Sequence, residues 1–221
     1  MTGSGFEVPA SIGHQVRRVL RLHDGDELLL LDGAGAQARC RITGGATLLE
    51  VLDRGPAAGE PRHRLVILQA LLKGDGLEHV IRQGTELGVA GFGLMTTRRT
   101  VARELSPRRL ERLRAIAREA AEQSERGRVP QVAEPVPFPG AIGGGGVLLH
   151  PRGEGDRPRL GSLAPPEALL VGPEGGFHPD EIAEAEGAGL VIAGLGPRIL
   201  RAESVAIAAA AAVLSRTGDF A

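Results

Sequence analysis

Two glycine-containing segments near the end of the chain combine residue types that could bind a flat ligand. The first, at residues 172–176 (GPEGG), follows an apolar run and precedes Pro179, so we expect it at the carboxyl edge of a sheet, where open α/β folds bind ligands. Glycine lets the backbone approach a ligand closely, and free N–H and C=O groups can read the edge of an adenine. The second, at residues 194–197 (GLGP), follows another apolar run in the same way. We therefore expect the two loops to face one another.

Charged residues crowd the segment after the second loop. Arg198, Arg201 and Glu203 lie at the start of an expected helix, where the positive end of the helix dipole disfavours cations. This local conflict suggests that a negatively charged ligand or partner binds there. The alternatives are a surface Arg–Glu salt bridge for these residues and a simple tight turn for the loop at 172–176.

Two common nucleotide-binding motifs are absent from the sequence. The glycine loop lacks the GKS or GKT ending of a phosphate-binding loop, and the chain contains no G-x-G-x-x-G. Both absences argue against an NTPase and against a dinucleotide-binding enzyme.

The first sixty residues predict a small β-barrel. Three short runs at 27–31, 38–43 and 47–52 have strand character and are separated by Asp-Gly and Gly-Gly turn signals. The run at 14–22 is expected to form a helix, and the stretch at 53–61 (DRGPAAGEP) a linker. In that helix the apolar side chains of Val16, Val19 and Leu20 would share one face, leaving the basic ones for the other.

After residue 64, strands and helices alternate, which predicts a mostly parallel sheet covered by helices. Strands are expected at 65–71, 92–97, 147–149, 168–171 and 190–193. Helices are expected at 77–87, at 106–126 with Ser106 as N-cap, after Pro179, and at 201–216. The stretches at 143–146 and 151–166 are expected to be loops.

Composition limits the class of protein. The net charge is −1 over 221 residues, so any contact with nucleic acid must be a local patch. The single cysteine, Cys40, excludes an intrachain disulfide, and the six histidines lack zinc-type spacing, so we expect no metal. No signal peptide and no membrane-length apolar run are visible, and we expect a soluble, cytoplasmic protein.

Five ordered motifs resemble one known family across essentially the whole chain. The chain is similar to the bacterial 16S ribosomal RNA 3-uridine methyltransferases (the RsmE type) of the SPOUT superfamily. The motifs are VLRLHDGDELLLLDG at 19–33, KGDGLEHVIRQGTELGV at 73–89, AREAAEQSERGRVP at 117–130, LVGPEGGF at 170–177 and LGPRILRAES at 195–204.

The resemblance implies an α/β fold with two domains and a homodimer. Residues 1–60 would form a PUA-like RNA-binding β-barrel domain, and residues 64–221 a SPOUT methyltransferase domain whose C-terminal chain is threaded as a trefoil knot. The active site would lie near the subunit interface. Family members commonly have lysine where this chain has Gly76 and Gln83, and threonine where it has Ser204.

The resemblance also implies methyl transfer from S-adenosylmethionine to N3 of one uridine in the 16S rRNA of the small ribosomal subunit. Because N3 carries a proton, that proton must leave, so a base or an imidate-stabilising cation is required. Arg201 is our candidate for stabilising the negative uracil, and Glu203 for orienting it or accepting the proton.

Cofactor and RNA contacts complete the expected site. The residues expected to bind the cofactor are Leu149, His150, Val171, Gly172, Pro173, Glu174, Gly175, Gly176, Leu195, Gly196, Ile199, Leu200 and Ser204. Between Arg98 and Arg128, ten arginines outnumber five glutamates, which offsets the neutral overall charge. The residues expected to contact RNA phosphates are Arg17, Arg18, Arg21, Lys73, Arg98, Arg99 and Arg126. A solvated helix face would explain many of these arginines equally well.

Two alternatives remain from the sequence. One is a non-catalytic ribosome-assembly factor that binds rRNA, motivated by the lysines missing at 76 and 83. The other is an enzyme of the same fold that acts on another RNA, such as tRNA.

Overall fold

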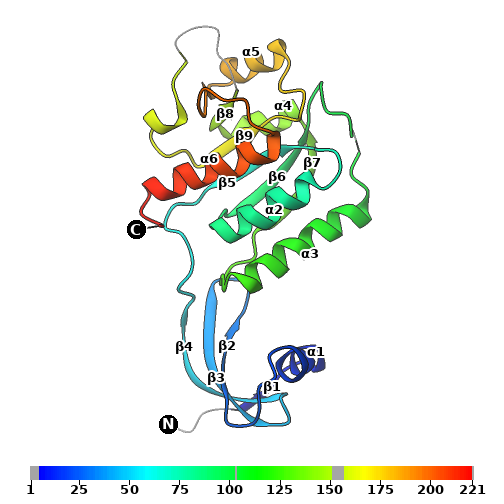
Figure 1. Ribbon diagram of the computed structural model, residues 1–221, viewed down its shortest axis with the longest axis vertical. Helices are drawn as coiled ribbons and strands as arrows, with labels where there is room; N and C mark the ends of the chain where they lie inside the picture. The colour runs from blue at the N-terminus through cyan, green and yellow to red at the C-terminus, as the bar shows by residue number, and fades with distance from the viewer. Residues whose placement is uncertain (1–4, 103, 151–156, 221) are drawn as a thin grey trace. The chain divides into compact units, whose positions relative to one another are not determined.

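The computed structural model describes residues 5–102, 104–150 and 157–220, and the chain divides into two compact units (Figure 1). The first unit contains the residues up to Glu60 together with a later segment, Glu125–Arg128. The second unit contains the remainder, beginning at Pro61. The sequence did not indicate that residues from the middle of the chain join the first unit.

The first unit is built on a four-stranded antiparallel sheet. Its elements are β1 (Gly5–Glu7), α1 (Ala10–His14), β2 (Glu27–Leu31), β3 (Ala36–Gly44) and β4 (Leu48–Pro56). The strand order β1-β4-β3-β2 leaves β1 and β2 at opposite edges, so within the described residues the strands form a small antiparallel sheet and the expected β-barrel is not confirmed. Because β4 continues to Pro56, residues 53–56 belong to a strand and not to a linker. Cys40 is fully buried in the core of this unit.

The helical segment of the first unit differs from the prediction. The helix begins at Ala10 and continues as a π-helical turn, Gln15–Val19. A π turn changes the angular spacing of side chains, so only Val16 is buried, whereas Val19 is 67% exposed and Leu20 53% exposed. The prediction of a shared apolar face is therefore wrong for two of its three residues.

The second unit contains a six-stranded parallel sheet in the order β10-β8-β9-β5-β6-β7. Its strands are β5 (Val66–Ala70), β6 (Gly91–Thr96), β7 (Gln131–Pro137), β8 (Val147–Leu149), β9 (Ala168–Val171) and β10 (Val191–Ala193). Its α-helices are α2 (Gly76–Leu87), α3 (Pro107–Gln123), α4 (Phe138–Ala141), α5 (Pro179–Gly187) and α6 (Ala202–Arg216). The predicted α/β class with a mostly parallel sheet is confirmed.

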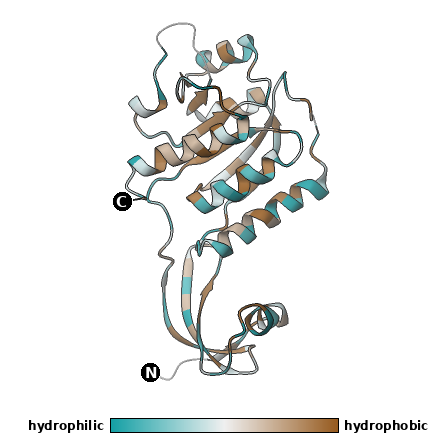
Figure 2. Ribbon diagram, viewed as in Figure 1, coloured by the Kyte–Doolittle hydropathy of each residue, from teal (hydrophilic) through white to brown (hydrophobic). Residues whose placement is uncertain are grey.

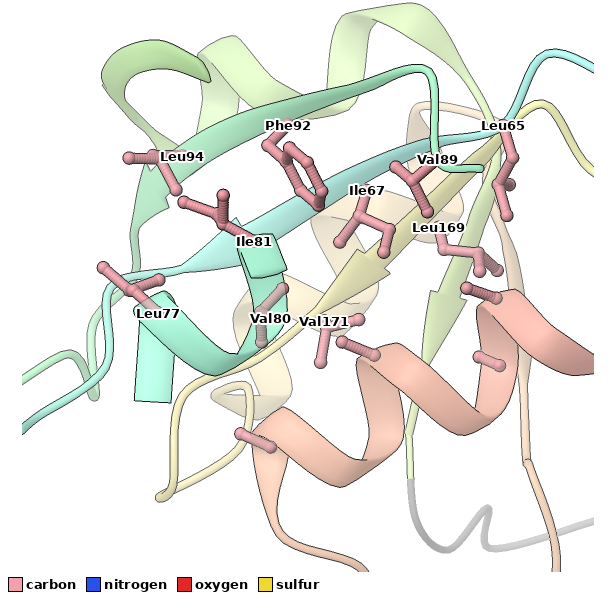
Figure 3. Packing of buried hydrophobic residues seen from close by; sticks show 14 of the residues in the cluster. Leu65, Ile67, Leu77, Val80, Ile81, Val89, Phe92, Leu94, Leu169 and Val171 are labelled. Carbon is pink, nitrogen blue, oxygen red and sulfur yellow. The ribbon is translucent and has the colours of Figure 1, made fainter. Parts of the chain in front are cut away.

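Side-chain alternation along the strands divides the core of this unit into two layers. Ile67, Leu94 and Leu169 point to one face, where they pack with α2, α3 and α6. Figure 3 shows these three side chains on the face that α2 and α6 cover. Their neighbours Met95 and Leu170 point to the other face, which α4 and α5 cover. In Figure 2 the strands between the helices are mostly hydrophobic, whereas α2 and α3 mix hydrophilic and hydrophobic residues, as expected for helices with one face against the sheet and one face in water.

Alanine allows α6 to lie close to its neighbours. Ala206, Ala209 and Ala210 are fully buried, and the helix packs against α2, β5 and β9. Small side chains let backbones approach closely, and a fully apolar buried helix needs no amphipathic pattern.

The predicted helices and strands of this unit are present, with small shifts at their ends. Ser106 caps α3 as expected, accepting a hydrogen bond from the backbone N–H of Arg109 at 3.3 Å. The helix ends at Gln123, three residues earlier than predicted, and Glu125 has a positive φ of 56°. The sequence missed α4 and also missed β7, whose prolines are tolerated because β7 is an edge strand.

Candidate active site

A cavity of about 710 Å³ lies where the strands of the parallel sheet end. The segments that follow β5, β6, β8, β9 and β10 all contribute to its wall, so one edge of the sheet gathers residues that are far apart in sequence. Both glycine-containing segments line it, as expected from their positions after buried strands. Every residue expected to bind the cofactor lines this cavity except Ser204, which is exposed on the first turn of α6.

Backbone geometry explains the glycines of the first loop. The N–H of Gly176 donates to the carbonyl of Pro173 at 2.9 Å, which closes a tight turn, and Gly176 has a left-handed φ of 68°. A β-carbon on Gly172 would lie 3.1 Å from the ring of Phe177. A β-carbon on Gly175 would lie 3.3 Å from the β-carbon of Arg99. The loop is therefore a tight turn and a cavity wall at once.

Two side chains fasten this loop to neighbouring segments. The carboxylate of Glu174 accepts a hydrogen bond from the backbone N–H of Lys73 at 2.9 Å. The guanidinium of Arg99 donates to the carbonyl of Gly175, also at 2.9 Å. Glu174 thus supports the shape of the loop, and Lys73 and Arg99 belong to the cavity wall, although the sequence indicated only RNA contacts for them.

His150 follows β8 and contributes its imidazole to the cavity wall. Burial, with smaller effects from the positive charges of Arg157 and Arg99, lowers the pKa of His150 below its ordinary value. Its Nδ1 is buried and has no hydrogen-bond partner among the described residues. The ring is therefore neutral near pH 7.

The second loop brings its charged residues to the cavity as predicted from their spacing. Arg198, Arg201 and Glu203 all line it. In the part of the chain that the structure describes, neither arginine forms an ion pair with Glu203, so the alternative of a surface salt bridge is not observed. Ile199, between the two arginines, is 69% exposed despite its apolar side chain.

The remaining expected RNA contacts lie outside the cavity. Arg18 and Arg21 are exposed, and Arg17 forms an ion pair with Asp24 at 2.6 Å. Arg98 pairs with Asp180 at the start of α5.

The structure contradicts the expectation that Arg126 contacts RNA phosphates. Its side chain is only 4% exposed and its guanidinium donates to the carboxylate of Glu60 at 2.9 Å, within the first unit. A buried and paired arginine is not available to a phosphate, so we exclude Arg126 from the expected RNA contacts.

Among the described residues, no group of three or more His, Cys, Asp or Glu side chains could hold a metal ion. In the same part of the chain, no helix is long and apolar enough to cross a membrane.

Comparison with known proteins identifies the family. A family model described as an RNA methyltransferase domain matches residues 59–214. A ribosomal RNA small subunit methyltransferase E from Mycobacterium bovis is 34% identical over 230 residues, which cover 96% of this chain and 87% of the relative. This chain belongs to the ribosomal RNA small subunit methyltransferase E family. The family suggested by the sequence motifs is therefore confirmed.

Other members of the ribosomal RNA small subunit methyltransferase E family agree. The protein from Synechocystis sp. is 37% identical over 86% of this chain, which spans 66% of that relative. A crystal structure of the family member from Neisseria gonorrhoeae bound to S-adenosylmethionine matches with a TM-score of 0.86 and 26% identity, covering 98% of this chain and 93% of that one. Outside the proteins that carry this family name, the structure of a methyltransferase from Legionella pneumophila in complex with the same cofactor matches with a TM-score of 0.81, also at 26% identity.

Proposed function

We propose that this chain transfers a methyl group from S-adenosylmethionine to N3 of a specific uridine in the 16S rRNA of the small ribosomal subunit. The observation that carries the proposal is the 710 Å³ cavity, in which both glycine loops, Arg201 and Glu203 meet at the carboxyl edge of the sheet. The family and the S-adenosylmethionine-bound structures of its relatives support the same activity. A ribosomal substrate also favours a cytoplasmic location.

The cavity fits the expected cofactor in size and chemistry. Its volume suits a ligand of nucleoside size, and its apolar wall includes Leu149, Val171 and Leu195, which can sandwich an adenine. The glycine loops offer backbone groups for the polar edges of the ligand. When bound, S-adenosylmethionine would supply an electrophilic methyl group on its sulfonium.

The charged residues of the second loop suit the chemistry at the uracil. N3 must lose its proton before it can accept a methyl group, and the developing negative charge needs stabilisation. Arg201 has no ion-pair partner within the described residues, so its charge is available for that purpose. Glu203 is close in sequence and lines the same wall, where its carboxylate can orient the base or accept the proton.

We further propose that the first unit is a PUA-like RNA-binding domain. Arg18 and Arg21 are exposed on it, and Arg17 is partly exposed beside Asp24. In the second unit, Lys73, Arg98 and Arg99 provide cations for RNA phosphates at or near the cavity.

The path of the C-terminal chain supports the expected trefoil knot. β10 lies at the edge of the sheet, whereas α6 packs over β9 and β5 in its interior. The segment that leads to β9 contacts the chain between β10 and α6: the N–H of Leu160 donates to the carbonyl of Gly194 at 2.8 Å. Arg216 at the end of α6 donates to the carbonyl of Leu163 at 2.7 Å. We propose that the chain after β10 is threaded as a trefoil knot past the segment that contains Leu160 and Leu163 and leads to β9.

Exposed apolar residues beside the cavity support the expected homodimer. Ile199 and Leu200 are 69% and 37% exposed and line the cavity, and Val101 is 64% exposed. Burial in a partner subunit would remove these side chains from water and enclose the site. If light scattering finds that the unaltered chain is a monomer at micromolar concentration, the dimer is excluded.

Mass spectrometry of 16S rRNA tests the activity. Deletion of the gene should remove 3-methyluridine, and restoration of the unaltered chain, but not of Arg201→Ala, should return it. Persistence of the modification in the deletion strain would favour the non-catalytic assembly factor. Methylation of assembled small subunits should also exceed that of naked tRNA, and the opposite preference would replace our substrate with tRNA.

A further inference from the structure

Gln69 is a polar residue in an otherwise apolar strand. It lies in β5 between Ile67 and Leu71, which both pack in the core, and its own side chain is fully buried. It does not line the cavity. Among the six glutamines, all of which lie in the described part of the chain, it is the only one that is buried.

The amide nitrogen of Gln69 contacts three carbonyl groups. Nε2 lies 3.2 Å from the carbonyl oxygen of Ala70, 3.3 Å from that of Val171 and 3.2 Å from that of Gly172, so its two N–H bonds are shared among three acceptors. The opposite orientation of the amide would bring its oxygen against three other oxygens, so the contacts fix which atom is nitrogen. The side chain thus joins β5 to the end of β9 and to the first residue of the glycine loop.

This arrangement has a cost for the core. The Oε1 atom of Gln69 is buried without a hydrogen-bond partner among the described residues. A buried polar atom without a partner is unfavourable, and an apolar residue of similar shape would avoid the penalty. Stability alone therefore does not account for a glutamine at this position.

The position of the three contacts suggests what the amide provides. A peptide unit is planar, so holding the carbonyl of Val171 also fixes the direction of the N–H of Gly172. A β-carbon on Gly172 would lie 3.1 Å from the ring of Phe177, a tight contact that favours glycine here, and glycine backbones have more conformational freedom than others. The amide restricts that freedom where the chain leaves the sheet and enters the cavity wall.

We propose that Gln69 is a positioning residue that holds the backbone at residues 171–172 in the conformation that binds the cofactor. The inference rests on the proposed function, because it assumes that the loop binds S-adenosylmethionine. Gln69 acts through the loop and touches no ligand itself.

Calorimetry with S-adenosylmethionine tests this role by comparing two core variants. Gln69→Met keeps the length and removes the amide, whereas Ile67→Val removes one methylene from the same strand and leaves the amide in place. We expect Gln69→Met to weaken binding about tenfold or more, the effect known for residues that orient the ligands of metal sites, whereas Ile67→Val changes the affinity less than about twofold. Equal affinities in the two variants, whatever their melting temperatures, would overturn the proposal.

A second measurement needs no variant and covers the case in which Gln69→Met does not fold. The chain contains no asparagine, so all side-chain amide signals in a ¹⁵N NMR spectrum come from six glutamines. The Gln69 signals are identified as those that exchange slowest with deuterium, because the other five side chains are exposed or half-buried. We expect them to shift when S-adenosylmethionine is added, and unchanged signals under saturation would overturn the proposal. If the unaltered chain does not bind S-adenosylmethionine at all, that result contradicts the proposed function itself and not only the role of Gln69.

Discussion

At the scale of single residues, His150 makes the stability of the folded chain depend on pH. Its pKa lies below the ordinary value of 6.5 because burial disfavours the charged ring and because Arg157 and Arg99 add positive charge nearby. In the unfolded chain the ring regains its ordinary pKa. Between the two pKa values the unfolded state binds more protons, so acid favours unfolding.

The stabilising effect of neutral His150 should therefore be complete above pH 6.5 and lost as the pH falls through the lower pKa of the folded state. Urea unfolding at about pH 7.5 and about pH 5.5 measures this loss. We expect His150→Gln to lose less stability on acidification than the unaltered chain, because glutamine does not titrate. The other histidines are common to both proteins and cancel in the comparison. Equal losses would show that His150 does not couple folding to pH.

Gly175 tests the glycine loop by steric means. Because a β-carbon there would lie 3.3 Å from the β-carbon of Arg99, Gly175→Leu should displace either Arg99 or the loop. We expect calorimetry to find S-adenosylmethionine affinity reduced by about tenfold or more, or about 1.4 kcal/mol of binding free energy. The control is Gly161→Leu, because a β-carbon at this exposed position meets no atom within 4 Å. An affinity equal to that of the control would place the cofactor elsewhere.

At the scale of elements, local signals determine where the helices begin. Ser106 and Pro107 start α3 in the way that their residue types predict, and His178 with Glu181 forms a capping box at the start of α5. α6 begins differently, because Arg201 occupies its N-cap without a side-chain hydrogen bond to the helix. The arginine remains directed to the cavity wall, and the helix depends on its buried alanines for stability.

Replacing the cap of α3 tests this argument. Ser106→Ala should lower the free energy of unfolding by about 0.5–2 kcal/mol, because the backbone N–H of Arg109 loses its acceptor. The control is Ser215→Ala near the end of α6, where the exposed hydroxyl donates to a helix carbonyl at 3.3 Å and contributes little. Chemical denaturation compares the two variants. A cap variant as stable as the control would mean that tertiary packing alone fixes the start of α3.

At the scale of the whole molecule, the first unit is made from two separate parts of the chain. Segment Glu125–Arg128 joins it through a hydrogen bond from the N–H of Gly35 to the carbonyl of Gly127 at 2.9 Å and through the buried ion pair of Glu60 and Arg126. The carboxylate of Glu60 also accepts from the backbone N–H of Arg128 at 2.9 Å. One glutamate thus attaches the later segment at two points.

Removing that carboxylate should be costly because it breaks the ion pair with the buried guanidinium of Arg126 and takes an acceptor from the backbone N–H of Arg128. We expect Glu60→Ala to lower the free energy of unfolding of the first unit by about 1.5–3 kcal/mol, as is typical for the loss of hydrogen bonds to a charged group. Glu27→Ala breaks exposed pairs with Arg39 and Arg41 in the same unit and should cost less than about 1 kcal/mol. Denaturant unfolding, combined with hydrogen exchange of the first unit, measures the loss of stability in each of the two variants. Similar losses in both variants would contradict a buried, energetically important pair.

Much of the second unit and its site could be predicted from the sequence because the signals are local. Apolar runs predicted β5, β6, β8, β9 and β10, and glycines directly after two of these strands indicated where a ligand could approach the backbone. Parallel strands end at a common edge, so the two loops had to lie at that edge if the sheet formed. The five motifs and their order indicated the family, whereas composition alone could not indicate it.

Only the tertiary structure decided which residues meet. Lys73 and Arg99 line the cavity, Ser204 does not, and Arg126 is buried against Glu60. These positions could not be predicted from the sequence because they depend on contacts between residues that are distant in sequence. The role proposed for Gln69 arises in the same way, since its amide reaches carbonyls about a hundred residues later in the chain. The sequence determined where the backbone could bend and approach a ligand at residues 172–176 and 194–197, because that is a property of local residue types. Folding decided which charges surround those loops, because electrostatics and burial depend on distance in space.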